Sequence, residues 1–168
     1  MDSEATGQTL PIFVYGTLMI GQPNDYVWQE CIESFESAFI NDFRIFDFGY
    51  YPVMAEEEGG KVLGQLVRLE GTCYSRTIQN LDFLEGFDPK HPHQSNFRRI
   101  RVFVSTDKGE NIEAWAYIGW KSTVRKLPLI EHGDWGRHAA EKDETIADWW
   151  AEIKTVLDDT RRSGGSAH

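Results

Sequence analysis

The regular alternation of apolar and polar side chains in two segments is the strongest constraint on how this chain can fold. Residues 61–70 and 98–105 both alternate in this way, and a period of two predicts β-strands with one buried face. Residues 112–120 predict a further strand. The intervening residues 107–110, Asp-Lys-Gly-Glu, have the composition of a tight turn, so we expect the last two strands to form a hairpin.

Two more strands are expected nearer the N-terminus. The apolar run Pro11–Tyr15 predicts a short buried strand. Residues 38–48 mix aromatic side chains with isoleucines, which also favours a strand. The acidic and glycine-rich residues 56–60 predict an exposed turn between this strand and the one at 61–70.

Three segments predict helices, at residues 23–34, 75–84 and 145–157, because their apolar residues recur at helical spacing. Ser75 is a candidate N-cap for the second helix, and Gly86 is a natural stop. Strands and helices follow one another without a regular βαβ repeat. The expected fold class is therefore α+β, with a mixed sheet and helices packed on it.

The length of 168 residues favours one folded domain. We expect a flexible lead-in at residues 1–10, a single domain at 11–158 and a disordered tail at 159–168, which is rich in Gly and Ser. The first ten residues do not match a signal peptide. No apolar run approaches the roughly 20 residues that cross a bilayer, so we expect a cytoplasmic protein.

The formal net charge of −10 argues against nucleic acid and anionic membrane surfaces as partners, because both need a basic footprint. The net charge does not exclude a small substrate, because the local charge of a cleft can oppose it. We therefore expect a small-molecule partner, and a chain that is a monomer or a homodimer.

The two cysteines and the closest pair of histidines do not predict a metal site. Cys31 and Cys73 match no metal or redox spacing. A disulfide between them is possible, but two buried free thiols are favoured for a cytosolic protein. His91-Pro92-His93 favours a surface loop, because no cysteine or carboxylate completes a ligand spacing. We expect neither a metal nor an organic cofactor.

A candidate binding loop, Tyr15-Gly16-Thr17-Leu18, follows the first strand. A glycine at a strand end lets the backbone turn and lets another group approach closely. Loops at strand ends are also places where backbone N–H groups are presented to ligands. We therefore expect this loop to bind a ligand.

Glu85 is a candidate general base, because the second predicted helix ends beside it at Gly86. The negative end of the helix dipole and partial burial would both raise the pKa of this carboxyl. A carboxylate with a raised pKa is a better base near neutral pH. From spacing alone, an ordinary solvated glutamate is the commoner outcome.

Several short segments together resemble the γ-glutamylcyclotransferase-like family, which includes the AIG2-like proteins. The two most specific are the loop at residues 15–18 and Leu-Asp-Phe-Leu-Glu-Gly at residues 81–86. The others are Tyr51-Pro52-Val53-Met54, Gly60 and Val62 to Leu69, Phe97-Arg98-Arg99, Ala114-Trp115-Ala116-Tyr117 and His132-Gly133-Asp134-Trp135. The resemblance covers about residues 13–135.

The resemblance implies a small mixed β-barrel with helices around it. It also implies an enzyme that cyclises a γ-glutamyl group to 5-oxoproline and releases the attached amine. By resemblance, Glu85 is the general acid/base, and the backbone of Tyr15, Gly16, Thr17 and Leu18 holds the γ-glutamyl group. A non-catalytic binding protein on the same fold is the alternative.

Two aromatic residues bear on the contacts with the substrate. Tyr117 is a candidate substrate contact, and a core tyrosine whose hydroxyl is satisfied is the alternative. Phe97 stands where members of the family often have tyrosine, so one polar contact of the family is in doubt here.

Overall fold

The computed structural model describes residues 9–22, 25–49 and 51–142. The chain divides into two compact units, residues 1–135 and 136–168. The second unit is described only through residue 142, and residues 136–142 are helical. The predicted helix at 145–157 and the tail at 159–168 lie outside the described residues, so the domain boundaries at 11 and 158 stay predictions.

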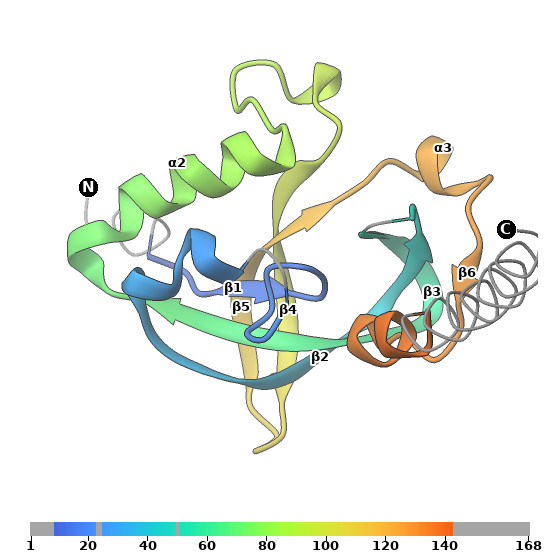
Figure 1. Cartoon of the computed structure of the whole chain (residues 1–168), viewed down its shortest axis with the longest axis horizontal. Coiled ribbons are helices and arrows are strands. Elements are labelled where there is room, and N and C mark those ends of the chain that lie inside the picture. Colours follow the sequence, from blue (N-terminus) through green and yellow to red (C-terminus); the bar gives the residue numbers. More distant parts are fainter. Residues whose placement is uncertain (1–8, 23–24, 50, 143–168) are drawn as a thin grey trace, which may run out of the picture. The chain divides into compact units, whose positions relative to one another are not determined.

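The first unit is built on a sheet whose strands close into a barrel (Figure 1). The strands are β1 (Ile12–Val14), β2 (Ile32–Asp47), β3 (Pro52–Leu69), β4 (Arg98–Thr106), β5 (Asn111–Ile118) and β6 (Leu129–Ile130). Their order is β3-β1-β5-β4-β2-β6, and β3 also pairs with β2. Five strands therefore form a closed ring, and β6 is added beside β2. Only the β1–β5 pairing is parallel among the described strands.

The helices that the structure describes completely in this unit are short, apart from one. They are the 3₁₀ helices η1 (Asp25–Val27), η2 (Gln29–Cys31), η3 (Gly71–Cys73) and η4 (Pro92–Gln94), and the α-helices α2 (Tyr74–Glu85) and α3 (Lys121–Val124). In Figure 1, α2 (green) lies along one side of β1, and the long, curved β2–β3 pair passes on the other side. Among the described helices, none is long and apolar enough to cross a membrane.

The α+β class and the mixed barrel with flanking helices are confirmed. The apolar faces of the strands fill the barrel, and Ile12, Ile45, Met54, Leu66 and Val104 are almost completely buried. The predicted hairpin at 107–110 joins β4 to β5, whose residues pair from Arg98↔Ile118 to Ser105↔Asn111. Alternation in sequence thus located these strands correctly.

Three local predictions are wrong. Residues 25–31 form two 3₁₀ turns instead of a helix at 23–34, and β2 already begins at Ile32. Residues 56–59 are exposed and Gly60 is buried, but all five lie inside β3, where residues 57–60 form a bulge between the pairs Asn41↔Lys61 and Phe43↔Glu56. Ser75 does not cap α2, because the helix begins at Tyr74 after η3.

The prediction of free thiols is also wrong, because Cys31 and Cys73 form a disulfide. Cys31 lies just before β2 and Cys73 lies shortly after β3. The antiparallel pairing of these strands places Ile32 opposite Leu69, and so brings the two cysteines to the same end of the β2–β3 ribbon. The disulfide therefore joins two segments that are 42 residues apart in sequence.

We expect reduction of this disulfide to lower the free energy of unfolding by about 4 kcal/mol, the chain-entropy value for a loop of this length. The measurement is the urea midpoint of the wild type with and without a dithiol reductant. Cys73→Ser is the control, because it lacks the bond and should not respond to the reductant. A wild-type midpoint that does not change on complete reduction would contradict this account.

Candidate functional site

A cavity of about 310 Å³ lies between the loop after β1 and the C-terminal end of α2. The start of β3 and the residues before β4 supply the remaining walls. The lining residues are Phe13, Val14, Tyr15, Gly16, Thr17, Leu18, Tyr51, Pro52, Leu84, Glu85, Gly86, Asn96, Phe97 and Tyr117. Every site residue predicted from the sequence is among them, so the structure brings together segments more than 100 residues apart.

Close packing and hydrogen bonds hold the loop at residues 15–18 in place. A Cβ at Gly16 would come within 2.7 Å of Cγ of Pro52, so this position admits only glycine without a shift. The Met19 N–H donates to the Gly16 carbonyl over 3.0 Å and closes a turn. The next N–H, of Ile20, donates to Oε1 of Gln65 over 2.7 Å. The loop is therefore fastened to β3 at two points.

The backbone of the loop keeps unused donors. The buried indole Nε1–H of Trp28 donates to the Leu18 carbonyl over 3.1 Å. In the part of the chain that the structure describes, no acceptor is paired with the N–H of Gly16 or of Leu18. Both residues line the cavity, so the loop can offer hydrogen-bond donors to an anionic or carbonyl oxygen.

Glu85 is the last residue of α2, as predicted. Gly86 follows in the left-handed conformation, with φ of 69°. Its N–H donates to the Phe83 carbonyl, and the N–H of Phe87 donates to the Asp82 carbonyl. These two bonds form a Schellman motif, which ends the helix and turns the chain away. The helix end is therefore specified by local sequence, and Glu85 is placed at the cavity.

Burial raises the pKa of Glu85 from 4.5 to about 7. The side chain is half-buried, and no other described residue hydrogen-bonds or pairs with its carboxyl group. A carboxyl group without such a partner loses hydration without compensation, which disfavours its charged form. At neutral pH both of its protonation states are therefore populated, as general acid–base chemistry requires.

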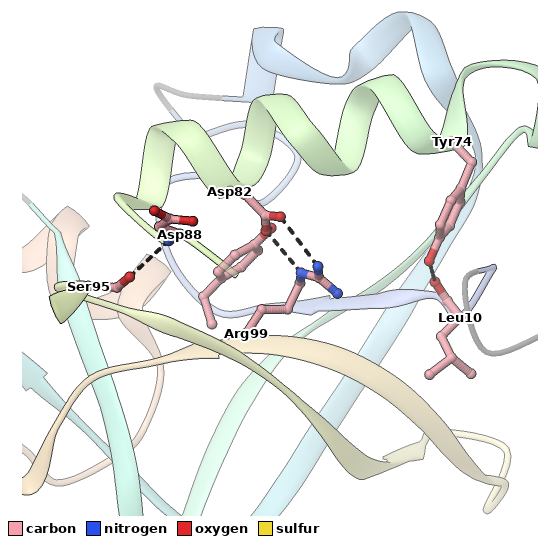
Figure 2. A network of polar contacts seen from close by, with 7 residues as sticks. Leu10, Tyr74, Asp82, Asp88, Ser95 and Arg99 are labelled. Carbon is pink, nitrogen blue, oxygen red and sulfur yellow. Dashed lines mark hydrogen bonds and ion pairs between the residues drawn. The ribbon is translucent and has the colours of Figure 1, made fainter. Parts of the chain in front are cut away.

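A buried polar network lies one helical turn before Glu85 (Figure 2). Asp82 accepts hydrogen bonds from Nε of Arg99 at 2.9 Å and from Nη2 at 3.3 Å. The Tyr117 hydroxyl donates to the same carboxylate over 2.7 Å. The network thus ties α2 to β4 and β5. At the other end of α2, the Tyr74 hydroxyl donates to the Leu10 carbonyl over 2.6 Å, so the helix is fixed at both ends.

Both tyrosines predicted to contact the substrate have hydroxyls that are already bonded within the protein. The Tyr15 hydroxyl donates to the Tyr117 carbonyl over 2.6 Å and accepts from the Met54 N–H at 3.3 Å. Burial raises the pKa of both phenols, and the neighbouring Asp82 raises that of Tyr117 further. These hydroxyls stay protonated, and the geometry favours a wall and positioning role for Tyr117.

Sequence reasoning missed the roles of Asp82 and Arg99 and the place of Tyr51 and Asn96 in the cavity wall. In the sequence, Asp82 was noted only as part of the segment at residues 81–86. A signal was present in its position three residues before Glu85, which places both side chains on neighbouring parts of the helix surface. Phe97 is buried and lines the cavity. The cavity wall therefore lacks the hydroxyl that a tyrosine would supply at this position.

The two histidines of the predicted surface loop have separate neighbours. The exposed His91 places Nδ1 3.0 Å from Oδ2 of Asp88. The ring of His93 lies 6.1 Å from that of Trp120. The two imidazole rings therefore contact different neighbours.

Comparison with known proteins identifies the family. The model of the family described as "Gamma-glutamyl cyclotransferase, AIG2-like" matches residues 12–137. The chain belongs to this family. A Vibrio cholerae protein named "Putative gamma-glutamylcyclotransferase" is 29% identical over 126 residues, which are 74% of this chain and 93% of that protein.

Solved structures agree with this fold. Protein ytfP from Escherichia coli is 26% identical with a TM-score of 0.53, over 75% of this chain and 96% of that one. YkqA from Bacillus subtilis is 24% identical with a TM-score of 0.58, over 80% of this chain and 42% of that one. PH0828 from Pyrococcus horikoshii is 22% identical with a TM-score of 0.54, over 80% of this chain and 97% of that one. The latter two likenesses concern the fold alone.

We expect Asp82→Asn to lower the free energy of unfolding by about 3 kcal/mol, because it leaves the Arg99 guanidinium without a buried counter-charge. Urea denaturation at neutral pH measures the change. Asp88→Asn is the matched control, because Asp88 pairs with His91 at the exposed surface, where water screens the pair and its loss should change stability little. Equal losses in the two variants would contradict the role given to the Asp82 network.

We expect Glu85→Gln to stabilise the fold at pH 8 by up to about 3 kcal/mol, because it removes the cost of burying a charge. The folded-state pKa, about 7, lies above the unfolded value of 4.5. The wild type therefore loses stability as pH rises from 4.5 to about 7, and the difference between the proteins should shrink below that range. Urea denaturation at several pH values tests this, with the exposed Glu58→Gln as the control. A pH-independent difference would contradict the buried carboxyl.

Proposed function

We propose that this protein is a γ-glutamylcyclotransferase, which cyclises a γ-glutamyl amine, amide or dipeptide to 5-oxoproline and releases the amine. One observation carries the proposal. A carboxyl group with a pKa of about 7, that of Glu85, shares a small cavity with the backbone of the loop at residues 15–18. Membership of the family supports the same reaction class.

The reaction follows from the chemistry of the substrate. The α-amine attacks the γ-carbonyl carbon of the same molecule, so one carbon–nitrogen bond forms and the bond to the leaving amine breaks. The attacking amine must be neutral and must lose a proton as the new bond forms. Glu85 takes this proton as its carboxylate and delivers it to the departing nitrogen as its acid. One group can do both, because the two nitrogens share a carbon in the tetrahedral intermediate.

The loop would hold the folded-back substrate. Unpaired N–H groups of Gly16 and Leu18 can donate to the α-carboxylate or to the oxygen that becomes negative in the intermediate. The loop is fixed by Pro52 and Gln65 before substrate arrives, so little reorganisation accompanies the reaction. Because the attack is intramolecular, binding the cyclic conformer supplies much of the acceleration. Tyr15, Thr17 and Tyr117 complete the wall around this group.

We expect the wild type to form 5-oxoproline from at least one member of a panel of γ-glutamyl compounds, with chromatography as the assay. Glu85→Gln should lower kcat by about 10²–10⁴-fold, the usual contribution of a general acid–base group. The rate should fall as pH drops below the Glu85 pKa of about 7, where the carboxylate is lost.

Glu58→Gln, at the exposed bulge, is the control and should be fully active. Equal turnover by the wild type and Glu85→Gln would overturn the role of Glu85. Thermal stabilisation by 5-oxoproline and by γ-glutamyl amines, without turnover of any of them, would instead favour a non-catalytic binding protein.

A further inference from the structure

A second cavity, of about 300 Å³, adjoins the first. The two cavities share the wall residues Tyr51, Asn96 and Phe97. Glu85 and the loop at residues 15–18 line only the first cavity. The two cavities therefore meet at these three side chains, which a substrate reaching from the first into the second would have to pass.

Four aromatic side chains, those of Phe48, Tyr51, Phe97 and Trp120, line the second cavity beside several polar residues. Phe48 and Tyr51 stack on each other with ring centroids 5.1 Å apart, and Tyr51 lies 6.1 Å from Phe97. Trp120 forms another wall, and its Nε1–H donates to the Ser95 carbonyl over 2.8 Å. Phe48 is 48% exposed although it is large and apolar. Such a surface binds flat apolar groups by stacking and by burying area.

The charges around this cavity disfavour a cation. None of the described residues that line it carries a carboxylate. The guanidinium carbon of Arg98 lies 4.5 Å from the centre of the Trp120 ring, and the ring of His93 stacks on the same indole. A positively charged leaving amine, such as that of a diamine, would meet positive charge and no counter-ion there.

We propose that the second cavity binds the leaving half of the substrate and selects γ-glutamyl compounds whose leaving half is an aralkyl group that carries no charge while it is joined to the γ-carbonyl. This inference rests on the proposed cyclotransferase function. In the reaction, the γ-carbonyl to nitrogen bond of this half breaks, the nitrogen gains its proton from Glu85, and the aralkyl amine leaves through the second cavity.

The first experiment compares kcat/KM for three substrates that share the γ-glutamyl group. They are γ-glutamyl-phenethylamide, γ-glutamyl-butylamide and the γ-glutamyl amide of 1,4-diaminobutane. We expect the aralkyl substrate to exceed the butyl one by about tenfold, because a stacked ring contributes about this much. The cationic substrate should be the poorest. A cationic substrate equal to or better than the aralkyl one would overturn the proposal.

Phe48→Ala tests the cavity wall. It should lower kcat/KM for the aralkyl substrate by about tenfold through KM, and should leave turnover of glutamine unchanged, because ammonia is too small to reach Phe48. Phe103→Ala is the matched control, because Phe103 is also exposed but lies on β4 and lines neither cavity. Equal effects of the two variants on the aralkyl substrate would overturn the proposal.

Thr123→Glu tests the charge argument by a gain of activity. Thr123 is an exposed residue of α3 that lines the second cavity, so its substitution should leave the fold intact. The new carboxylate should raise kcat/KM for the diamine substrate at least fivefold relative to the aralkyl one. An unchanged ratio would overturn the placement of the leaving half. The outcomes separate the two proposals. If the wild type forms no 5-oxoproline from any substrate, the proposed cyclotransferase function is refuted. If it forms 5-oxoproline without these selectivities, only the role of the second cavity is refuted.

Discussion

The pairing of β3 along both of its edges is the constraint on which the rest of the structure depends. One edge pairs with β1 and the other with β2, and this double pairing closes the barrel. It requires Gly64, because a Cβ there would collide with the Val14 carbonyl. The same strand sets Pro52 against Gly16 and Gln65 against Ile20. Closure of the barrel and the shape of the loop at residues 15–18 therefore both depend on the packing of β3.

Much of the fold and of the site could be predicted because its signals are local. Alternation in residues 61–70 and 98–105 reports one buried face of each strand and needs no knowledge of the partner. Gly86 after an apolar helical face marks the end of α2, and thus places Glu85 at a helix terminus. Proximity of the loop at residues 15–18 to Glu85 is a long-range fact, and only the family resemblance predicted it.

The wrong predictions concern features that distant pairing decides. Residues 56–60 have the composition of a turn, but the pairs Phe43↔Glu56 and Asn41↔Lys61 keep them in β3, with residues 57–60 as a bulge. Cys31 and Cys73 lie far apart in sequence, and only the antiparallel register of β2 and β3 brings them together. Free thiols were expected because a disulfide is rare in the reducing cytosol that we expected for this chain, and not because the spacing of the two cysteines forbids a bond.

Helix α2 carries two carboxyl groups one turn apart, and only one of them has hydrogen-bond donors around it among the described residues. Asp82 is buried but accepts hydrogen bonds from Arg99 and Tyr117, so its charge is compensated and serves to anchor the helix. Glu85 has no such partner among the described residues, and burial raises its pKa to about 7. The presence of hydrogen-bond donors at Asp82 and their absence at Glu85, in the part of the chain that the structure describes, thus distinguish a carboxyl group that holds the structure from one that is available for proton transfer. Asp82 also attaches the end of α2 to β4 and β5 through Arg99 and Tyr117, and this attachment holds Glu85 in the cavity, where its charge is costly.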